Sequence, residues 1–256
     1  MTLPDLDTIF NAHLLVYVAV GFGAQLIDGS LGMAYGISSN TFLVSLGLPP
    51  ATASASVHIA ETFITGISGY SHWKFKNVNK RLLWALVVPG VLGVVLGAYI
   101  LTEIDGKIVK PFVAAYLFLM GLIILRKSFL PVSKKSKTPP IYPLAFVGGF
   151  LDAIGGGGWG PVVVSTLMNS GRDARYIIGT VNLSEFFISL AGAGTFLILI
   201  QISNWQAVVG LLLGGCSAAP FAAWICARLN PKYFMAFVGT IILVLSGKTL
   251  WLALGQ

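Results

Sequence analysis

Four carboxylates are the residues best suited to do chemistry inside the apolar segments of this chain. They form two pairs, Asp28 with Glu61 and Asp152 with Glu185, and the second pair follows the first by 124 residues. Ionised acids are costly in a membrane interior, so such groups usually mark ion pathways or proton relays. Burial favours the neutral form of a carboxyl group, which lets it exchange a proton near neutral pH. The four acids therefore predict proton coupling. The alternative is that each acid caps a short helix or pairs with a polar residue.

A glycine-rich stretch surrounds or follows the aspartate of each pair. The longer one reads GGFLDAIGGGGWGPVV, from Gly148 to Val163, and the shorter one contains Gly29, Gly32 and Gly36. Glycines at a break between two short helices allow close approach, and the helix that begins there directs free N–H groups into the centre. We therefore expect an anion site made of backbone. The alternative is that these glycines only permit close helix packing.

His58 is the only side chain near the predicted site that could become a cation, because neither the glycine-rich stretches nor the glutamate-bearing segments contain Lys or Arg. It lies one turn before Glu61, so both side chains share a helix face. Asn182, 124 residues further on, takes the corresponding place before Glu185. Hydrogen bonding to a substrate or proton exchange with Glu61 is the functional interpretation, and a buried structural histidine is the alternative. A metal site is not expected, because no second histidine lies in a membrane segment. Further candidates are the hydroxyls of Ser30, Ser38, Ser39, Ser56, Thr62, Ser165, Thr180 and Ser184, with Trp159 as a pocket wall.

We therefore predict two sets of site residues and no catalytic residues, cofactor or metal. The predicted proton-coupling residues are Asp28, Glu61, Asp152 and Glu185. The predicted substrate-binding residues are Gly29, Ser30, Gly32, Ser38, Ser39, His58, Gly155, Gly156, Gly157, Gly158, Trp159, Ser165 and Asn182.

The composition requires a lipid bilayer around these residues. Of 256 residues, 56% are hydrophobic and only 10% are charged, and the mean hydropathy is +0.85. A soluble domain could not bury so much apolar surface, so the class is an all-α polytopic membrane protein. The net charge of +7 is spread over short loops, which argues against nucleic-acid binding. The apolar runs, each near the length needed to span a bilayer, are Val57–Tyr70, Leu82–Thr102, Ile108–Leu125, Tyr176–Ile202, Trp205–Ala227 and Phe234–Leu254.

The chain consists of two homologous halves. An offset of 124 residues pairs SVHIAETF with TVNLSEFF, and an offset of 125 then pairs Phe112 with Phe237. Agreement over so long a stretch indicates an internal repeat. We expect a first membrane repeat at 1–125, a basic cytoplasmic linker at 126–142 and a second membrane repeat at 143–256.

The loop charges indicate that the two halves are inverted. Lysines at 74, 76 and 80 mark one loop of the first half as cytoplasmic, but its counterpart in the second half, QISNWQ, carries no charge. Inversion requires an odd number of crossings per half. Three long helices supply it if 14–46 and 143–170 each form a re-entrant pair of short helices with a glycine tip. A broken spanning helix is the competing interpretation of those stretches. Both termini are expected outside a cell membrane.

The chain resembles the TauE/SafE family of sulfite and organosulfonate exporters. The resemblance rests on IDGSLGMAYG and LDAIGGGGWG, on ASASVHIAETFITGISG and IIGTVNLSEFFISLAG, and on the basic central linker, and it covers nearly the whole length. It implies a plasma-membrane transporter of a small anion that is driven by the proton gradient.

We therefore expect a secondary transporter, a proton-coupled exporter of a small sulfur-containing anion such as sulfite or a sulfoacetate-like organosulfonate. The anion would bind at the midplane between the two tips. The alternatives are a passive anion channel and a non-catalytic membrane partner subunit. No enzyme is expected, because no Ser-His, Cys-His or metal constellation lies on nearby helices. A homodimer is compatible with the sequence.

Overall fold

The computed structural model describes residues 12–31, 33–129, 140–168, 173–201, 204–226 and 231–255, which form helices joined by short loops. No strand occurs in these ranges, so the predicted all-α class is confirmed. The elements are α2 (Ala12–Leu31), α3 (Tyr35–Ser45), α4 (Pro50–Lys74), α5 (Lys80–Glu103), α6 (Gly106–Phe129), α7 (Ile141–Gly155), the π-helix η1 (Trp159–Val164), α8 (Ser165–Met168), α9 (Ala174–Leu199), α10 (Trp205–Cys226) and α11 (Pro231–Leu254).

Each half contains the three long helices that the apolar runs predict. These are α4, α5 and α6 in the first half and α9, α10 and α11 in the second, with 22 to 26 residues each. Within the described ranges, α5, α6 and most of α9 and α11 are long and apolar enough to cross a membrane. α4 is more polar, and its polar residues Ser54, Ser56, His58 and Glu61 are buried. A membrane helix that is enclosed by other helices can carry such residues.

Each glycine-rich stretch contains a break between two helices. The first break lies between α2 and α3, where Ala34 has a φ of 109°. The second lies between α7 and η1, where Gly156 and Gly157 have φ values of 62° and 155°. Glycine adopts such angles without a steric penalty, so the second break suits its residues, whereas the first break holds an alanine at a positive φ. α2 has 20 residues, which is longer than the short helix that we expected there.

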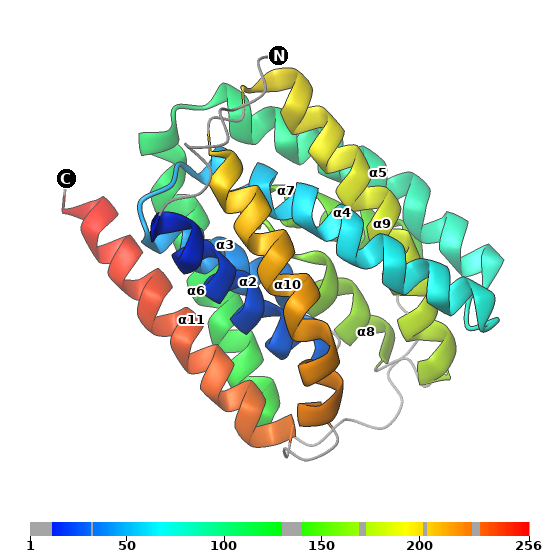
Figure 1. The fold of residues 1–256 in the computed structure, drawn as a ribbon. Coiled ribbons are helices and arrows are strands. Elements are labelled where there is room, and N and C mark those ends of the chain that lie inside the picture. Colours follow the sequence, from blue (N-terminus) through cyan, green and yellow to red (C-terminus); the bar gives the residue numbers. More distant parts are fainter. Residues whose placement is uncertain are drawn as a thin grey trace.

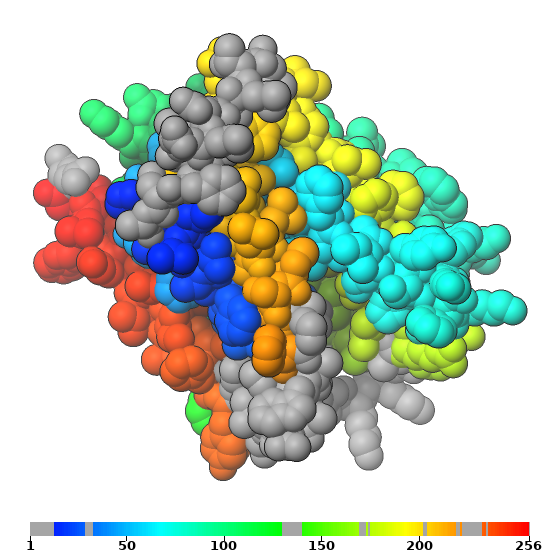
Figure 2. Space-filling model, in the orientation of Figure 1, coloured from blue at the N-terminus to red at the C-terminus, as the bar shows by residue number. Residues whose placement is uncertain are grey.

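Helices from different halves pack in repeat-related pairs. α4 packs on α9 and α6 on α11, while α2 packs on α10 and α7 on α5. In Figure 1, α6 and α11 lie side by side, and α4, α9 and α5 form the opposite part of the bundle. Figure 2 shows α10 between α2 and α4 on one face. The first helix of each half is therefore held by the other half.

The related helices α4 and α9 run in opposite directions. His58 lies against Gly192, and Gly69, further along α4, lies against Leu183, earlier in α9. α6 and α11 cross in the same antiparallel sense. Inverted copies would pack in this way, whereas the orientation of the two halves across a membrane remains a prediction.

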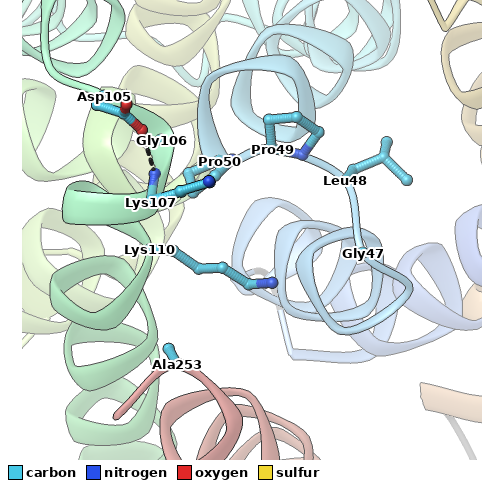
Figure 3. A pocket seen from close by; sticks show the side chains of 9 residues that line it. All are labelled: Gly47, Leu48, Pro49, Pro50, Asp105, Gly106, Lys107, Lys110 and Ala253. Atoms are coloured by element: carbon cyan, nitrogen blue, oxygen red, sulfur yellow. Dashed lines mark hydrogen bonds between the residues drawn. The ribbon is translucent and has the colours of Figure 1, made fainter. Parts of the chain in front are cut away.

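The first hairpin, α2 with α3, enters and leaves at one end of the molecule. Asn204, directly before α10, donates a hydrogen bond from Nδ2 to the hydroxyl of Tyr17 in α2 (3.1 Å), so α2 begins where α10 begins. α10 follows the end of α9, which lies beside the start of α4. α3 ends there too, because only residues 46–49 separate it from α4. The residues from Gly47 to Pro50, which connect α3 to α4, line a pocket of about 620 Å³ together with Asp105 and Ala253 (Figure 3).

The second hairpin, α7 with η1 and α8, enters and leaves at the opposite end. Ile141, at the start of α7, shares a pocket with Asn79 and Arg81. α9 begins at the same end, where the guanidinium of Arg175 donates a hydrogen bond to the carbonyl of Phe75 (3.1 Å). Both stretches therefore form helical hairpins that enter and leave at one end of the molecule, as the re-entrant interpretation expects, and their placement in a membrane stays a prediction.

Candidate functional site

The tips of the two hairpins contact each other inside the molecule. A Cβ atom placed on Gly36, in the first turn of α3, would overlap the carbonyl oxygen of Gly156 and lie 2.7 Å from the Cα of Gly157. Asn40, one turn further along α3, donates a hydrogen bond from Nδ2 to the carbonyl of Gly155 (2.6 Å). The absence of side chains on these glycines is what allows the two backbones to meet.

The two aspartates cap the helices that begin at the tips. Asp152 Oδ1 accepts hydrogen bonds from the N–H groups of Gly158 (2.7 Å) and Trp159 (2.9 Å). Asp28 Oδ1 accepts one from Tyr35 (3.3 Å), the repeat partner of Trp159. These N–H groups are therefore bound by carboxylates of the protein itself. The expectation that they are free for an anion is wrong for this conformation, because each aspartate is close enough along the chain to reach its own tip.

His58 pairs with Asp152 rather than with Glu61. Its Nε2 lies 3.3 Å from Asp152 Oδ2, and the two side chains are 0% and 1% exposed. Its Nδ1 lies 2.9 Å from the carbonyl oxygen of Ser54 in the preceding turn. The ring packs edge-on against Phe196, with 5.6 Å between the ring centroids. The pair thus joins α4 of the first half to the tip of the second half.

The two glutamates belong to α4 and α9, which pack against each other. Glu61 is buried, and a Cβ on Gly36 would lie 2.7 Å from its Oε1. Its Oε2 accepts a hydrogen bond from the hydroxyl of Ser189 in α9 (3.4 Å). Glu185 is half-buried and interacts electrostatically with Asp28 and with the capping carboxylate of the second tip. The four predicted carboxylates are therefore close enough to influence one another electrostatically.

Several polar atoms near the tips have no hydrogen-bond partner within the part of the chain that the structure describes. Buried polar atoms are rarely left unbonded, so these atoms require water or a ligand. Tyr116 of α6 lies against Gly155 and Gly158, and its hydroxyl is one of them. The others on α3 and η1 are Ser38 Oγ, Ser39 Oγ, Asn40 Oδ1, Thr41 Oγ1 and Trp159 Nε1. The site can therefore offer both donors and acceptors to a small polar molecule.

Two predicted substrate-binding residues are engaged elsewhere. Asn182 of α9 accepts a hydrogen bond from Ser68 of α4 (3.1 Å). In the repeat, Asn182 corresponds to His58 and Ser68 to Gly192, which also contact each other. Ser165 accepts a hydrogen bond from Lys127 Nζ (2.6 Å). Lys127 also donates to the carbonyl of Pro161 (3.3 Å), so a cation of α6, which extends to Phe129, reaches the second hairpin.

The remaining predicted residues are placed as follows. Ser39 is buried on α3, and its hydroxyl has no hydrogen-bond partner within the described residues. Gly29 and Ser30 lie in the last turn of α2, where only the backbone is described, and Gly32 lies outside the described residues. Most of the other candidate hydroxyls bond to the backbone of their own helix, as Ser56, Thr62 and Ser184 do.

Sequence reasoning missed four polar residues at the tips. Asn40 and Tyr116 contact the glycines, and Ser189 donates a hydrogen bond to Glu61. The hydroxyl of Ser54 donates a hydrogen bond to the carbonyl of Ala153 (2.5 Å), and the carbonyl of Ser54 contacts Nδ1 of His58. A polar residue within an apolar segment was the available signal for all four.

Comparison with known proteins agrees with the architecture. The family model described as "Sulfite exporter TauE/SafE" matches residues 17–249. The chain is 41% identical to the probable membrane transporter protein YtnM of Bacillus subtilis (strain 168), over 94% of this chain and 84% of the relative. It is 25% identical to the probable membrane transporter protein ORF9 of Sinorhizobium sp, over 90% and 87%, and 23% identical to the probable membrane transporter protein YjnA of Bacillus subtilis (strain 168), over 89% and 96%.

No solved structure matches the chain. The relatives are described as transporters and not as enzymes, in agreement with the expectation from the sequence. With a family model that covers nearly the whole length, the chain belongs to the TauE/SafE sulfite exporter family of membrane transporters.

Proposed function

We propose that the chain is a proton-coupled secondary transporter that exports a small sulfur-containing anion, such as sulfite or a sulfoacetate-like organosulfonate, across the cell membrane. The observation that carries the proposal is the contact between the two hairpin tips, Gly36 against Gly156 and Gly157, inside a ring of buried polar groups. Irregular backbone at membrane depth is tolerated where it lines a cavity or is buried in protein. Transporters built from repeats place their substrate sites at such meeting points.

The chemistry of the cluster suits an oxyanion that moves with protons. The hydroxyl groups of Ser38, Thr41 and Tyr116 can donate hydrogen bonds to sulfonate oxygens, and the indole N–H of Trp159 is a further donor. The four carboxylates can bind and release protons. Alternating access would move one half against the other about the tips.

Flux into proteoliposomes of the purified chain tests the proposal. Sulfite, sulfoacetate, taurine and sulfate are compared at two opposite pH gradients. We expect saturable flux of a sulfur-containing anion whose rate depends on the direction of the pH gradient when the membrane potential is clamped. Flux that follows only the electrical and anion gradients would identify a passive channel, and no flux of any of these compounds would contradict the proposed substrate class.

The glutamates give a sharper test. Glu61→Gln and Glu185→Gln each remove one titratable group while keeping its shape. We expect either change to lower proton-driven flux about tenfold or more, equivalent to about 1.4 kcal/mol or more. Glu103→Gln, at the exposed end of α5, is the matched control and should keep wild-type flux. Unchanged pH dependence in both site variants would exclude these glutamates from coupling.

A further inference from the structure

The imidazole of His58 is fixed in one tautomer by its surroundings. A carbonyl oxygen can only accept a hydrogen bond, so the 2.9 Å contact between Nδ1 and the carbonyl of Ser54 requires a hydrogen on Nδ1. Gly192 and Phe196 contact the ring from α9, and Val94 of α5 lies beside it. Nε2 is therefore the nitrogen that can gain or lose a proton.

That nitrogen faces a carboxylate oxygen. His58 Nε2 and Asp152 Oδ2 are 3.3 Å apart in a region without solvent exposure. The contact is an ion-pair distance, and neither atom makes a hydrogen bond within the described residues. An unprotonated Nε2 and an ionised carboxylate are both acceptors and would repel each other, so the pair must carry a proton. The pair holds this proton either as imidazolium with carboxylate or as neutral imidazole with carboxylic acid.

The other oxygen of the same carboxylate, Asp152 Oδ1, caps the tip of the second hairpin. Asp152 Oδ1 binds the N–H groups of Gly158 and Trp159 at 2.7 Å and 2.9 Å. A charged acceptor binds N–H groups about twice as strongly as a neutral one. Protonation of Asp152 therefore weakens its hold on the two N–H groups, which a substrate anion can then bind at the start of the helix.

We propose that His58 and Asp152 share the exchangeable proton of the transport cycle, and that a second proton on this pair frees the tip of the second hairpin for the substrate anion. This inference rests on the proposed function. The pair with one proton is neutral overall, and the second proton leaves it with one positive charge. The anion that replaces the carboxylate at Gly158 and Trp159 then balances that charge. The proton and the anion therefore bind together, leave together and cross in the same direction. Net transport then follows the sum of the two gradients, so export requires an outward anion gradient that exceeds the inward proton gradient.

The two halves differ in this respect. Asp28 caps the first tip through a single N–H group at 3.3 Å, and the repeat position of His58 is Asn182, which bonds to Ser68 and cannot carry a proton. Coupling through a histidine is thus confined to the second tip. The other titratable groups that face Asp152 are Glu61 of α4, Tyr116 of α6, Glu185 of α9 and, through the glutamates, Asp28 of α2.

Nitrogen-15 NMR of histidine-labelled protein tests the pair without any substrate. The chain has three histidines, and His58→Asn identifies the His58 signals. We expect Nδ1 of His58 to stay protonated at every pH and Nε2 to show a pH transition that shifts in Asp152→Asn. His72→Asn, the same replacement at the end of the same helix, is the matched control and should leave the transition in place. An unprotonated Nδ1 of His58, or a pH transition of Nε2 that Asp152→Asn does not shift, would overturn the proposal.

The second test measures proton movement with the anion. Sulfoacetate, which stays ionised near neutral pH, is applied outside proteoliposomes that contain a pH dye, with the membrane potential clamped. We expect uptake to acidify the lumen in the wild type and in His72→Asn. In His58→Asn, sulfoacetate-linked acidification should fall about tenfold or more. Uptake that makes the lumen alkaline, or acidification that persists in folded His58→Asn, would contradict shared proton and anion transport. Absence of uptake in the wild type would instead contradict the proposed substrate, and the NMR result would still decide the role of the pair.

Discussion

Gly36 lies at the closest approach of the two hairpins. A Cβ atom there would overlap the carbonyl oxygen of Gly156, lie 2.7 Å from the Cα of Gly157 and lie 2.7 Å from Oε1 of Glu61. Two of these neighbours are backbone atoms, which cannot rotate away as the end of a side chain can. Even one methyl group must therefore separate the tips.

Gly36→Ala should accordingly impair transport more than it impairs folding. Overpacking of this kind costs about 1–3 kcal/mol, and displacement of the tips should reduce flux strongly. Gly194→Ala is the matched control, because a Cβ there meets no atom within 4 Å. Flux and the midpoint of denaturant unfolding are measured for both variants. Wild-type flux in Gly36→Ala would show that the tips need not touch.

At the residue scale, the sequence predicts which residues are unusual but not which residues they contact. The carboxylates and glycines were identified because they repeat and because they are costly in an apolar segment. Their partners were not, since His58 bonds to a residue 94 positions away rather than to its neighbour on the same helix face. Asn40 and Tyr116 have no such signal beyond their polarity, because contacts between distant segments depend on the whole arrangement of helices.

Asn40 connects the elements on which the two tips are built. Its amide joins α3 of the first hairpin to the end of α7 in the second through the carbonyl of Gly155 (2.6 Å), and the side chain is completely buried. The long helices around it follow from the apolar runs, and the second break follows from its glycines, whereas the positive φ of the first break falls on Ala34. The exchange of partners, α2 with α10 and α7 with α5, could not be predicted, because similar apolar helix faces can pack in many combinations.

Asn40→Ala should loosen the two hairpins from each other. Loss of a buried hydrogen bond between elements costs about 1–3 kcal/mol when a partner is left unbonded, and about 0.6 kcal/mol is typical inside a membrane bundle. Thr195→Val removes a hydroxyl that bonds only within its own helix, to Ala191, and should have a smaller effect. Unfolding midpoints in detergent are compared. Equal midpoints for the two variants would show that this bond does not hold the tips together.

On the scale of the whole molecule, charge distinguishes the two ends of the bundle. The end that holds the loop at 75–79 carries Lys74, Lys76, Lys80 and Arg81, and Arg175 bonds to that loop. The other end holds the acidic loop at 103–105 and the uncharged stretch around Gln201, with Lys107 and Lys110 at its edge. Basic loops remain in the cytoplasm. We therefore expect the end with Lys74 to face the cytoplasm and the C-terminus to lie outside.

Single-cysteine labelling in intact cells tests this orientation and the inversion together. The positions Lys74 and Gln201 flank repeat-related loops, and both are exposed. In a background with Cys216 and Cys226 replaced by Ser, we expect a membrane-impermeant maleimide to label Gln201→Cys in intact cells and Lys74→Cys only after permeabilisation. Glu103→Cys, in the other loop at the outer end, serves as the control for outside labelling. Two parallel copies would place the repeat-related positions on the same side, so labelling of both or of neither in intact cells would exclude inverted halves, and labelling of Lys74→Cys alone would reverse the orientation.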